Sequence, residues 1–243
     1  MDKATGIANE HTVKSYDEEL SHLNNLIARM GGLAEAQLDG ALQSLIRRDS
    51  TLAGKVIAAD TKVDELEQEV HAFTVRLLAL RQPVAQDLRA IVGAIKVSGD
   101  LERIADYAAN AAKRALVLNQ LRPVKPVAGI PRLGALVQEL VKGVLDAYME
   151  QDVNKAVAVW KQDEEVDDMY TGLFRELITY MMEDPRNITA CIHLMFIAKN
   201  IERIGDHATN IAENIHFLVE GSPIRDARPK GDTLIPDVLS KEN

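Results

Sequence analysis

The sequence predicts an all-α protein, built as two tandem antiparallel three-helix bundles that are related by an internal repeat. Three observations lead to this fold class. Apolar residues make up 47% of the 243-residue chain but aromatic residues only 4%, a mixture that suits helices packed on helices. Apolar positions recur at steps of three and four residues. The pattern of the first half also returns in the second half, about 100 residues later.

The first bundle is predicted over residues 15–121, after a flexible N-terminus at residues 1–14. Its first helix covers about 15–47, because apolar residues recur throughout that stretch at helical spacing. The pair Gly31-Gly32 interrupts the stretch and would allow a kink there.

Turn residues separate the helices of this bundle. Asp49 or Ser50 is expected to cap the second helix, and Pro83 breaks the apolar pattern that follows. The second and third helices are therefore expected at about 51–80 and 84–119.

A proline-rich linker is predicted at residues 122–131, where three prolines interrupt the helical pattern. The second bundle is expected over residues 132–220. Its helices are predicted at about 132–150, 153–182 and 186–219. Gly221 and Pro223 are stop signals for the last helix, and residues 221–243 are expected to form a flexible tail.

The repeat holds when the two halves are aligned. "DLERIADYAANAAK" at 100–113 and "NIERIGDHATNIAE" at 200–213 are identical at seven of fourteen positions. "DTKVDE" at 60–65 aligns with "DEEVDD" at 163–168, at an offset of 103. The offset changes only across predicted connections or near helix ends, where deletions are tolerated. Each half therefore contains the same three-helix unit.

The acidic composition argues against several classes of protein. The net charge is −9, which repels nucleic acid and anionic membranes, so no nucleic-acid partner is expected. Cys191 is the single cysteine, so no internal disulfide or multi-thiolate zinc site can form. The sequence shows neither a secretory signal nor an apolar run near the roughly 20 residues that cross a bilayer. We expect a cytoplasmic protein without direct membrane insertion.

The repeated motifs place carboxylates at matching positions. Glu202 and Asp206 are four residues apart, so they lie one turn apart on the helix face opposite the apolar stripe. Like charges at this spacing repel by roughly a few tenths of a kcal/mol, which a bound cation would relieve. For a single pair of this kind, a solvated acidic face is the favoured interpretation.

The pair recurs, and the preceding helix of each half carries a second one. The full set is Asp60, Asp64, Glu102 and Asp106 in the first half and Asp163, Asp167, Glu202 and Asp206 in the second. Antiparallel packing can bring the two pairs of one half together on an open face. Carboxylate clusters of this kind hold cations such as magnesium, manganese and iron in helical bundles. His71 and His207 could add nitrogen ligands, or be ordinary surface or packed residues.

Arg103 and Arg203 directly follow the two motif glutamates. Each either forms a salt bridge with a neighbouring acidic residue or recognises a carboxylate or phosphate of a partner. Cys191 lies on an apolar helical stretch, so we expect it in the core rather than as a nucleophile. The sequence also lacks the P-loop, GxGxxG, GxSxG and HExxH motifs.

The doubled motif resembles that of the PhoU family. The resemblance rests on "DLERIADYAANAA" and "NIERIGDHATNIAENI", each preceded by a DxxxD pair on the previous helix, and on "DLRAIVGAIK" at 87–96. It covers about residues 14–220, and it is specific because the motif is doubled and correctly spaced.

The resemblance implies a PhoU-like fold and a regulatory function. Members of the family are cytoplasmic negative regulators of the phosphate-starvation response that also restrain phosphate uptake. They are understood to act without catalysis, as adaptors between the ATPase subunit of the phosphate ABC transporter and the sensor histidine kinase of the phosphate regulon. Homodimers are common. Some members bind iron or zinc clusters through E/DxxxD motifs, so the eight carboxylates given above are the implied metal ligands, with manganese or magnesium as alternatives.

The two halves are not fully symmetric. Arg89 has no counterpart in the second half, so the surface around it is a candidate partner contact, together with Arg103 and Arg203. Tyr107 stands where the second half has His207, and any two metal sites therefore need not be equivalent.

Two other interpretations stay open on the residues alone. A metal held by carboxylates could make the chain a metal-dependent phosphoesterase. Hydrolysis requires a pocket rather than an open face, however, and the Glu-x-x-His pattern of di-iron bundle enzymes is absent from the paired motifs. The chain could also be a purely structural helical scaffold. We expect the non-enzymatic, metal-binding adaptor.

Overall fold

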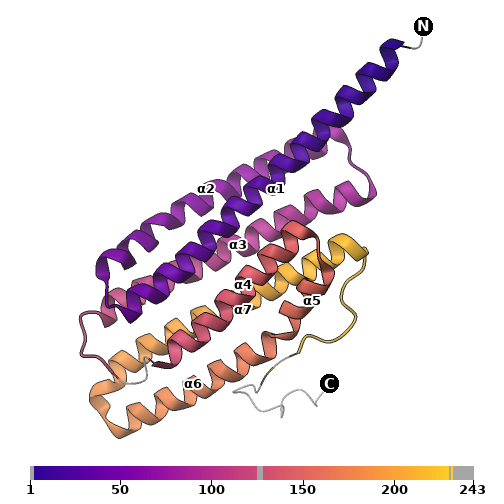
Figure 1. Cartoon of the computed structure of the whole chain (residues 1–243). Coiled ribbons are helices and arrows are strands. Elements are labelled where there is room, and N and C mark those ends of the chain that lie inside the picture. The colour runs from indigo at the N-terminus through magenta and orange to yellow at the C-terminus, as the bar shows by residue number, and fades with distance from the viewer. Residues whose placement is uncertain (1–2, 125–127, 230, 232–243) are drawn as a thin grey trace.

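Helices are the only regular secondary structure in the residues that the structure, a computed structural model, describes: 3–124, 128–229 and 231, with side chains from residue 16. The elements are α1 Lys3–Ile46, α2 Ser50–Arg81, α3 Ala85–Leu118, α4 Gly129–Glu150, α5 Val153–Lys161, α6 Asp163–Glu183, the 3-10 helix η2 Pro185–Asn187 and α7 Ile188–Glu220. Helices α1–α3 form one antiparallel bundle and α4–α7 the other (Figure 1). The predicted fold class is confirmed.

Short polar turns separate the helices near the expected places. The side chain of Asp49 accepts a hydrogen bond from the backbone N–H of Leu52 at 2.9 Å, so it is the N-cap of α2. Asp152 caps α5 in the same way, through two backbone N–H groups of the first turn. Gln82 adopts a left-handed conformation and Pro83 follows it, which ends α2.

Helix α1 is longer than the sequence predicted. It begins at Lys3, within the segment that was expected to be a flexible N-terminus. It also continues through Gly31-Gly32, where the sequence would have allowed a kink. The close approach of α4 explains why glycine is present, because a Cβ at Gly31 would collide with the Leu145 side chain.

The predicted helix at 153–182 is divided into α5 and α6. The N–H of Gln162 donates to the carbonyl of Val159, three residues back instead of four, which tightens the chain into a 3-10 turn. Asp163 thereby becomes the first residue of α6, where the helix dipole favours a negative charge. The aligned Asp60 lies inside the unbroken α2.

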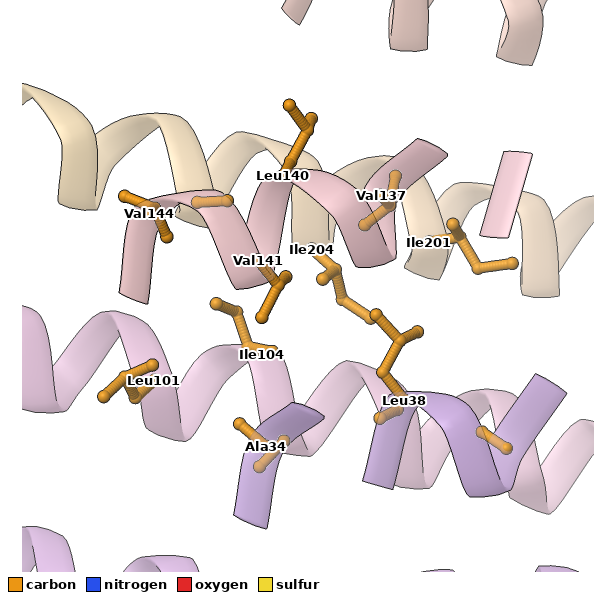
Figure 2. Packing of buried hydrophobic residues seen from close by; sticks show 14 of the residues in the cluster. Ala34, Leu38, Leu101, Ile104, Val137, Leu140, Val141, Val144, Ile201 and Ile204 are labelled. Atoms are coloured by element: carbon orange, nitrogen blue, oxygen red, sulfur yellow. The ribbon is translucent and has the colours of Figure 1, made fainter. Parts of the chain in front are cut away.

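The two bundles share one hydrophobic core. Helices α3 and α7 lie side by side and antiparallel. The Arg114 guanidinium is 4.5 Å from the Phe196 ring centroid near one end, and Lys96 Nζ is 6.0 Å from that of Phe217 near the other. Buried side chains from α1, α3, α4 and α7 meet between the bundles (Figure 2), among them Leu38, Ile104, Val141 and Ile204. The halves are therefore packed into a single body.

The structure also bears on the predicted position of Cys191 and on the prediction that no helix spans a membrane. Cys191 is fully buried, as predicted for a core residue. In the described ranges, no helix combines the length and the apolar character that crossing a bilayer requires.

Candidate functional site

The first four predicted metal ligands, here called the first cluster, gather between α2 and α3. Asp60 and Asp64 lie on α2, Glu102 and Asp106 lie on α3, and all four are half-buried. Their charges act on one another. Burial raises the pKa of Asp60, and the carboxylates of Asp106 and Asp64 raise it further. The two pairs of the first half therefore do converge.

Glu102 carries the strongest perturbation in this cluster. Burial raises its pKa to about 7, with the charge of Asp106 as the next cause. Arg103 offsets part of the repulsion, with Nε 3.3 Å from Glu102 Oε2 and Nη1 3.2 Å from Asp106 Oδ2. The salt bridge that was one of the two predicted roles of Arg103 is thus present, although exposure keeps it weak.

The second cluster is more deeply buried than the first. It consists of Asp163, Asp167, Glu202 and Asp206. Asp163 is 2% exposed and Glu202 is 8% exposed, so the predicted open face is wrong for these two carboxylates. For Asp163 the cause is the break before α6, which packs this residue against α7, where the Thr209 hydroxyl donates a hydrogen bond to Asp163 Oδ1 at 3.1 Å.

Two cationic side chains pair with three of the four carboxylates of this cluster. Lys199 Nζ is 2.6 Å from Glu202 Oε2. Arg228, from the segment after α7, donates to both oxygens of Asp163, from Nε at 2.7 Å and from Nη2 at 2.9 Å. The same Nη2 donates to Asp206 Oδ1 at 2.8 Å. One guanidinium thereby links the start of α6 to the middle of α7, in a bidentate geometry that is strong for this ion pair.

The chain itself passes over the second cluster. The N–H of Gly231 donates to Asp167 Oδ2 at 3.3 Å. A Cβ at Gly231 would lie 2.6 Å from Asp168 Oδ1 and 2.7 Å from the carbonyl oxygen of Glu164, so only glycine permits this approach. Residues 221–229 were expected as part of a flexible tail, yet they run back along the second bundle (Figure 1). Residues 230 and 232–243 of that tail lie outside the described residues.

The other predicted arginines lie away from the carboxylate clusters. The guanidinium of Arg203 is 5.5 Å from the ring centroid of Tyr107, across the boundary between the bundles. Arg89 Nε donates to the carbonyl of Leu218 at 3.5 Å, in the last turn of α7, where a positive charge is favourable. Both residues therefore help to join the bundles, and their predicted role in partner binding stays a prediction.

The two candidate histidines are directed at other groups. Nδ1 of His207 is 2.8 Å from Asp100 Oδ1, so this ring faces α3. Nε2 of His71 is 4.0 Å from Glu67 Oε1 and the side chain is largely exposed. The clusters therefore offer oxygen ligands, which suit hard or borderline cations.

The side chains do not form a ready metal site. Within the described part of the chain, no three Asp, Glu, His or Cys residues are grouped so that they could hold one ion. The first cluster still fits a cation in its chemistry, because it offers oxygen donors and because burial and repulsion by Asp106 raise the pKa of Glu102. The second does not fit one as it stands, because Arg228 lies between Asp163 and Asp206.

Fold and clusters together define a class of all-α proteins, built from two copies of a three-helix unit that each carry a carboxylate cluster. The chain belongs to the PhoU domain family, whose sequence model matches residues 27–115 and 130–215.

Known relatives and solved structures are similar over nearly the whole chain. The "phosphate-specific transport system accessory protein PhoU homolog" of Caulobacter vibrioides (strain NA1000 / CB15N) is 53% identical, over 93% of this chain and 98% of the relative. PhoU of Edwardsiella tarda is 36% identical, over 89% of each chain. The crystal structure of PhoU from Pseudomonas aeruginosa has a TM-score of 0.83 at 39% identity, covering 85% of this chain and 100% of that one.

Lys199 and Arg228 were not among the predicted site residues. The pairing of Lys199 was predictable from the sequence, because a lysine three residues before Glu202 lies on the same helix face, whereas the aligned first-half residue is Gly99. The pairing of Arg228 was not predictable, since its segment has no counterpart in the repeat and Asp163 is 65 positions away in the chain.

Proposed function

We propose that the chain is an accessory protein of a phosphate ABC transporter that restrains phosphate uptake and represses the phosphate-starvation response. The observation that carries this proposal is the match of both repeats to the PhoU domain family. Relatives named as phosphate-specific transport system accessory proteins support it, because the similarity spans 98% of the Caulobacter relative.

In this proposal the chain acts in the cytoplasm, without catalysis, as an adaptor. Its partners are the ATPase subunit of the transporter and the sensor histidine kinase of the phosphate regulon, and it forms a homodimer. A duplicated fold supports an adaptor role, because it presents two similar but unequal surfaces. Arg103 and Arg203 are exposed at matching positions, which suits contact with acidic groups of a partner.

Deletion of the gene tests the regulatory proposal, with an alkaline phosphatase reporter measured in high phosphate. We expect constitutive reporter expression, and restored repression when the wild-type chain is supplied. An Arg89→Glu chain tests the partner surface, because a reversed charge should weaken binding and leave the reporter active. Unchanged repression in the deletion strain would overturn the proposal as a whole.

We also propose that the first cluster binds a metal cation, either iron or zinc, or manganese or magnesium. A bound cation would neutralise the cluster and link α2 to α3. The raised pKa values of Asp60 and Glu102, caused first by burial and next by Asp106, support this proposal.

Metal analysis of protein purified without chelator tests the cation proposal. Two matched double variants remove the same residue types from one cluster each: Glu102→Ala with Asp106→Ala, and Glu202→Ala with Asp206→Ala. We expect the first variant to lose the metal and the second to retain it. Absence of metal from the wild-type protein and both variants would instead support a purely structural scaffold.

One observation favours a metal-dependent phosphoesterase as a second candidate. A hollow of about 760 Å³ lies beside the first cluster, lined among others by Glu102, Arg103 and Asn210. Hydrolysis of a generic phosphomonoester by the metal-loaded protein, abolished in the Glu102→Ala variant, would favour the enzyme. We expect no turnover above that of the variant.

A further inference from the structure

The segment after α7 places a positive charge inside the second cluster. The Arg228 side chain is 22% exposed, and its principal partner, the Asp163 side chain, is 3% exposed. Nε and Nη2 contact Asp163, Nη2 also contacts Asp206, and Nη1 is 3.4 Å from Asn210 Oδ1. The guanidinium is thus engaged on all three nitrogens by groups of α6 and α7.

The same segment is anchored on both sides of Arg228. Before it, Nδ1 of His216 is 2.9 Å from the carbonyl oxygen of Ser222, and Ile224 packs against the hydrophobic core. After it, the N–H of Gly231 reaches Asp167. The contact between Arg228 and Asp163 is therefore one of several that hold this segment against the second bundle.

The residues of the first half that align with the partners of Arg228 are paired with other cationic side chains. Asn110, the counterpart of Asn210, accepts a hydrogen bond from Lys113 Nζ at 3.2 Å. Lys113 and Arg103 both belong to α3 itself, and the Arg103 side chain is 56% exposed. Burial raises the pKa of Asp60 and of Glu102 in the first cluster, and it raises the pKa of Asp167 and of Glu202 in the second, so the clusters differ in the origin of their cationic partners.

We propose that Arg228 is the resident cation of the second cluster, and that the C-terminal segment and a divalent cation exclude each other there. Asp163 and Asp206 cannot hold the guanidinium and a metal ion in the same space, because two positive charges at contact distance repel. The inference rests on the proposed cation binding. It makes the two clusters unequal: the first is free to take a cation, whereas the second takes one only when the segment is released.

Titration with Mn²⁺ tests the stoichiometry, with free Mn²⁺ measured by electron paramagnetic resonance. We expect one equivalent bound to the wild-type full chain, lost on Asp106→Asn. Arg228→Gln should bind two, and the second should be lost when Asp206→Asn is added. Arg228→Lys keeps the charge and should bind one. Arg225→Gln is the matched control, because Arg225 lies on the same segment but is exposed, and it should also bind one.

Hydrogen exchange of the peptide that covers residues 221–231 tests the contact without reference to metal. We expect exchange to be about tenfold faster in Arg228→Gln than in the wild-type protein, because the segment then opens more often. Arg225→Gln should leave the exchange rate unchanged.

Three other outcomes would each overturn a different part of the proposal. Equal exchange in the wild-type protein and Arg228→Gln would overturn the contact. One equivalent of Mn²⁺ in both proteins would overturn the exclusion while leaving cation binding at the first cluster intact. Binding of no Mn²⁺ by either protein would overturn both the exclusion and the proposed cation site, even if the segment is released as expected.

Discussion

Single residues make the two copies of the same motif chemically different. Glu102 and Glu202 occupy matching positions, yet Lys199 pairs with Glu202 whereas the aligned first-half residue is Gly99. Asp163 lies at the start of a helix and is buried with a guanidinium partner, whereas Asp60 lies inside α2 and repels its neighbours. The repeated carboxylates therefore form one cluster that pairs with an exposed arginine of its own helix and one that pairs with an arginine of a distant segment.

Replacement of Glu102 by Gln should stabilise the metal-free protein at alkaline pH. The pKa of Glu102 is raised from 4.5 to about 7, chiefly by burial, so the folded state holds this proton more tightly than the unfolded state. The stability that this proton contributes is complete below about pH 4.5 and is lost as the pH rises through about 7. Glu102→Gln should therefore gain up to about 1 kcal/mol relative to wild type between pH 5 and pH 8, after allowing for solvent screening.

Urea denaturation at both pH values, with a chelator present, measures this difference. Glu65→Gln on the exposed face of α2 is the control, and it should show the same stability relative to wild type at both pH values. A pH-independent effect of Glu102→Gln would contradict the prediction.

At the scale of elements, local signals predicted the helices and long-range contacts limited the prediction. Asp49 and Pro83 act through their own backbone neighbours, so the sequence located the ends of α2 within one residue. The break at Gln162 was not predictable, because apolar residues continue in register on both sides. The convergence of the carboxylate pairs followed from the repeat, whereas the burial of Asp163 and its pairing with Arg228 depend on that break and on a distant segment.

The N-cap of α2 should contribute measurably to stability. The Asp49 carboxylate satisfies the N–H of Leu52 in the exposed first turn, so Asp49→Ala should cost about 1 kcal/mol. Asp49→Asn keeps an oxygen acceptor at the same position and should cost much less. Urea denaturation followed by circular dichroism measures both. Equal losses for Ala and Asn would show that the side-chain hydrogen bond is not the cause.

At the scale of the whole molecule, the shared core makes the two repeats interdependent. Helices α3 and α7 are the central helices of different bundles, yet their buried faces meet each other and those of α1 and α4 (Figure 2). Separation of the halves would expose this apolar surface to water at about 25 cal/mol for each Å². The repeat is therefore a unit of sequence but not a unit of stability.

This interdependence predicts that damage in the first half is felt in the second. Ile104 on α3 is fully buried and points toward Val141 of α4 (Figure 2), so Ile104→Ala should cost about 2–5 kcal/mol through lost burial and a cavity.

Trp160 is the single tryptophan and lies on α5, so its fluorescence reports the second half alone. We expect Ile104→Ala to lower the urea midpoint of the Trp160 signal as much as that of the circular dichroism signal, because one cooperative transition moves both probes together. Lys62→Ala, on the exposed face of α2, should shift neither. A Trp160 midpoint that stays at the wild-type value while the circular dichroism transition splits in two would show that the bundles unfold independently.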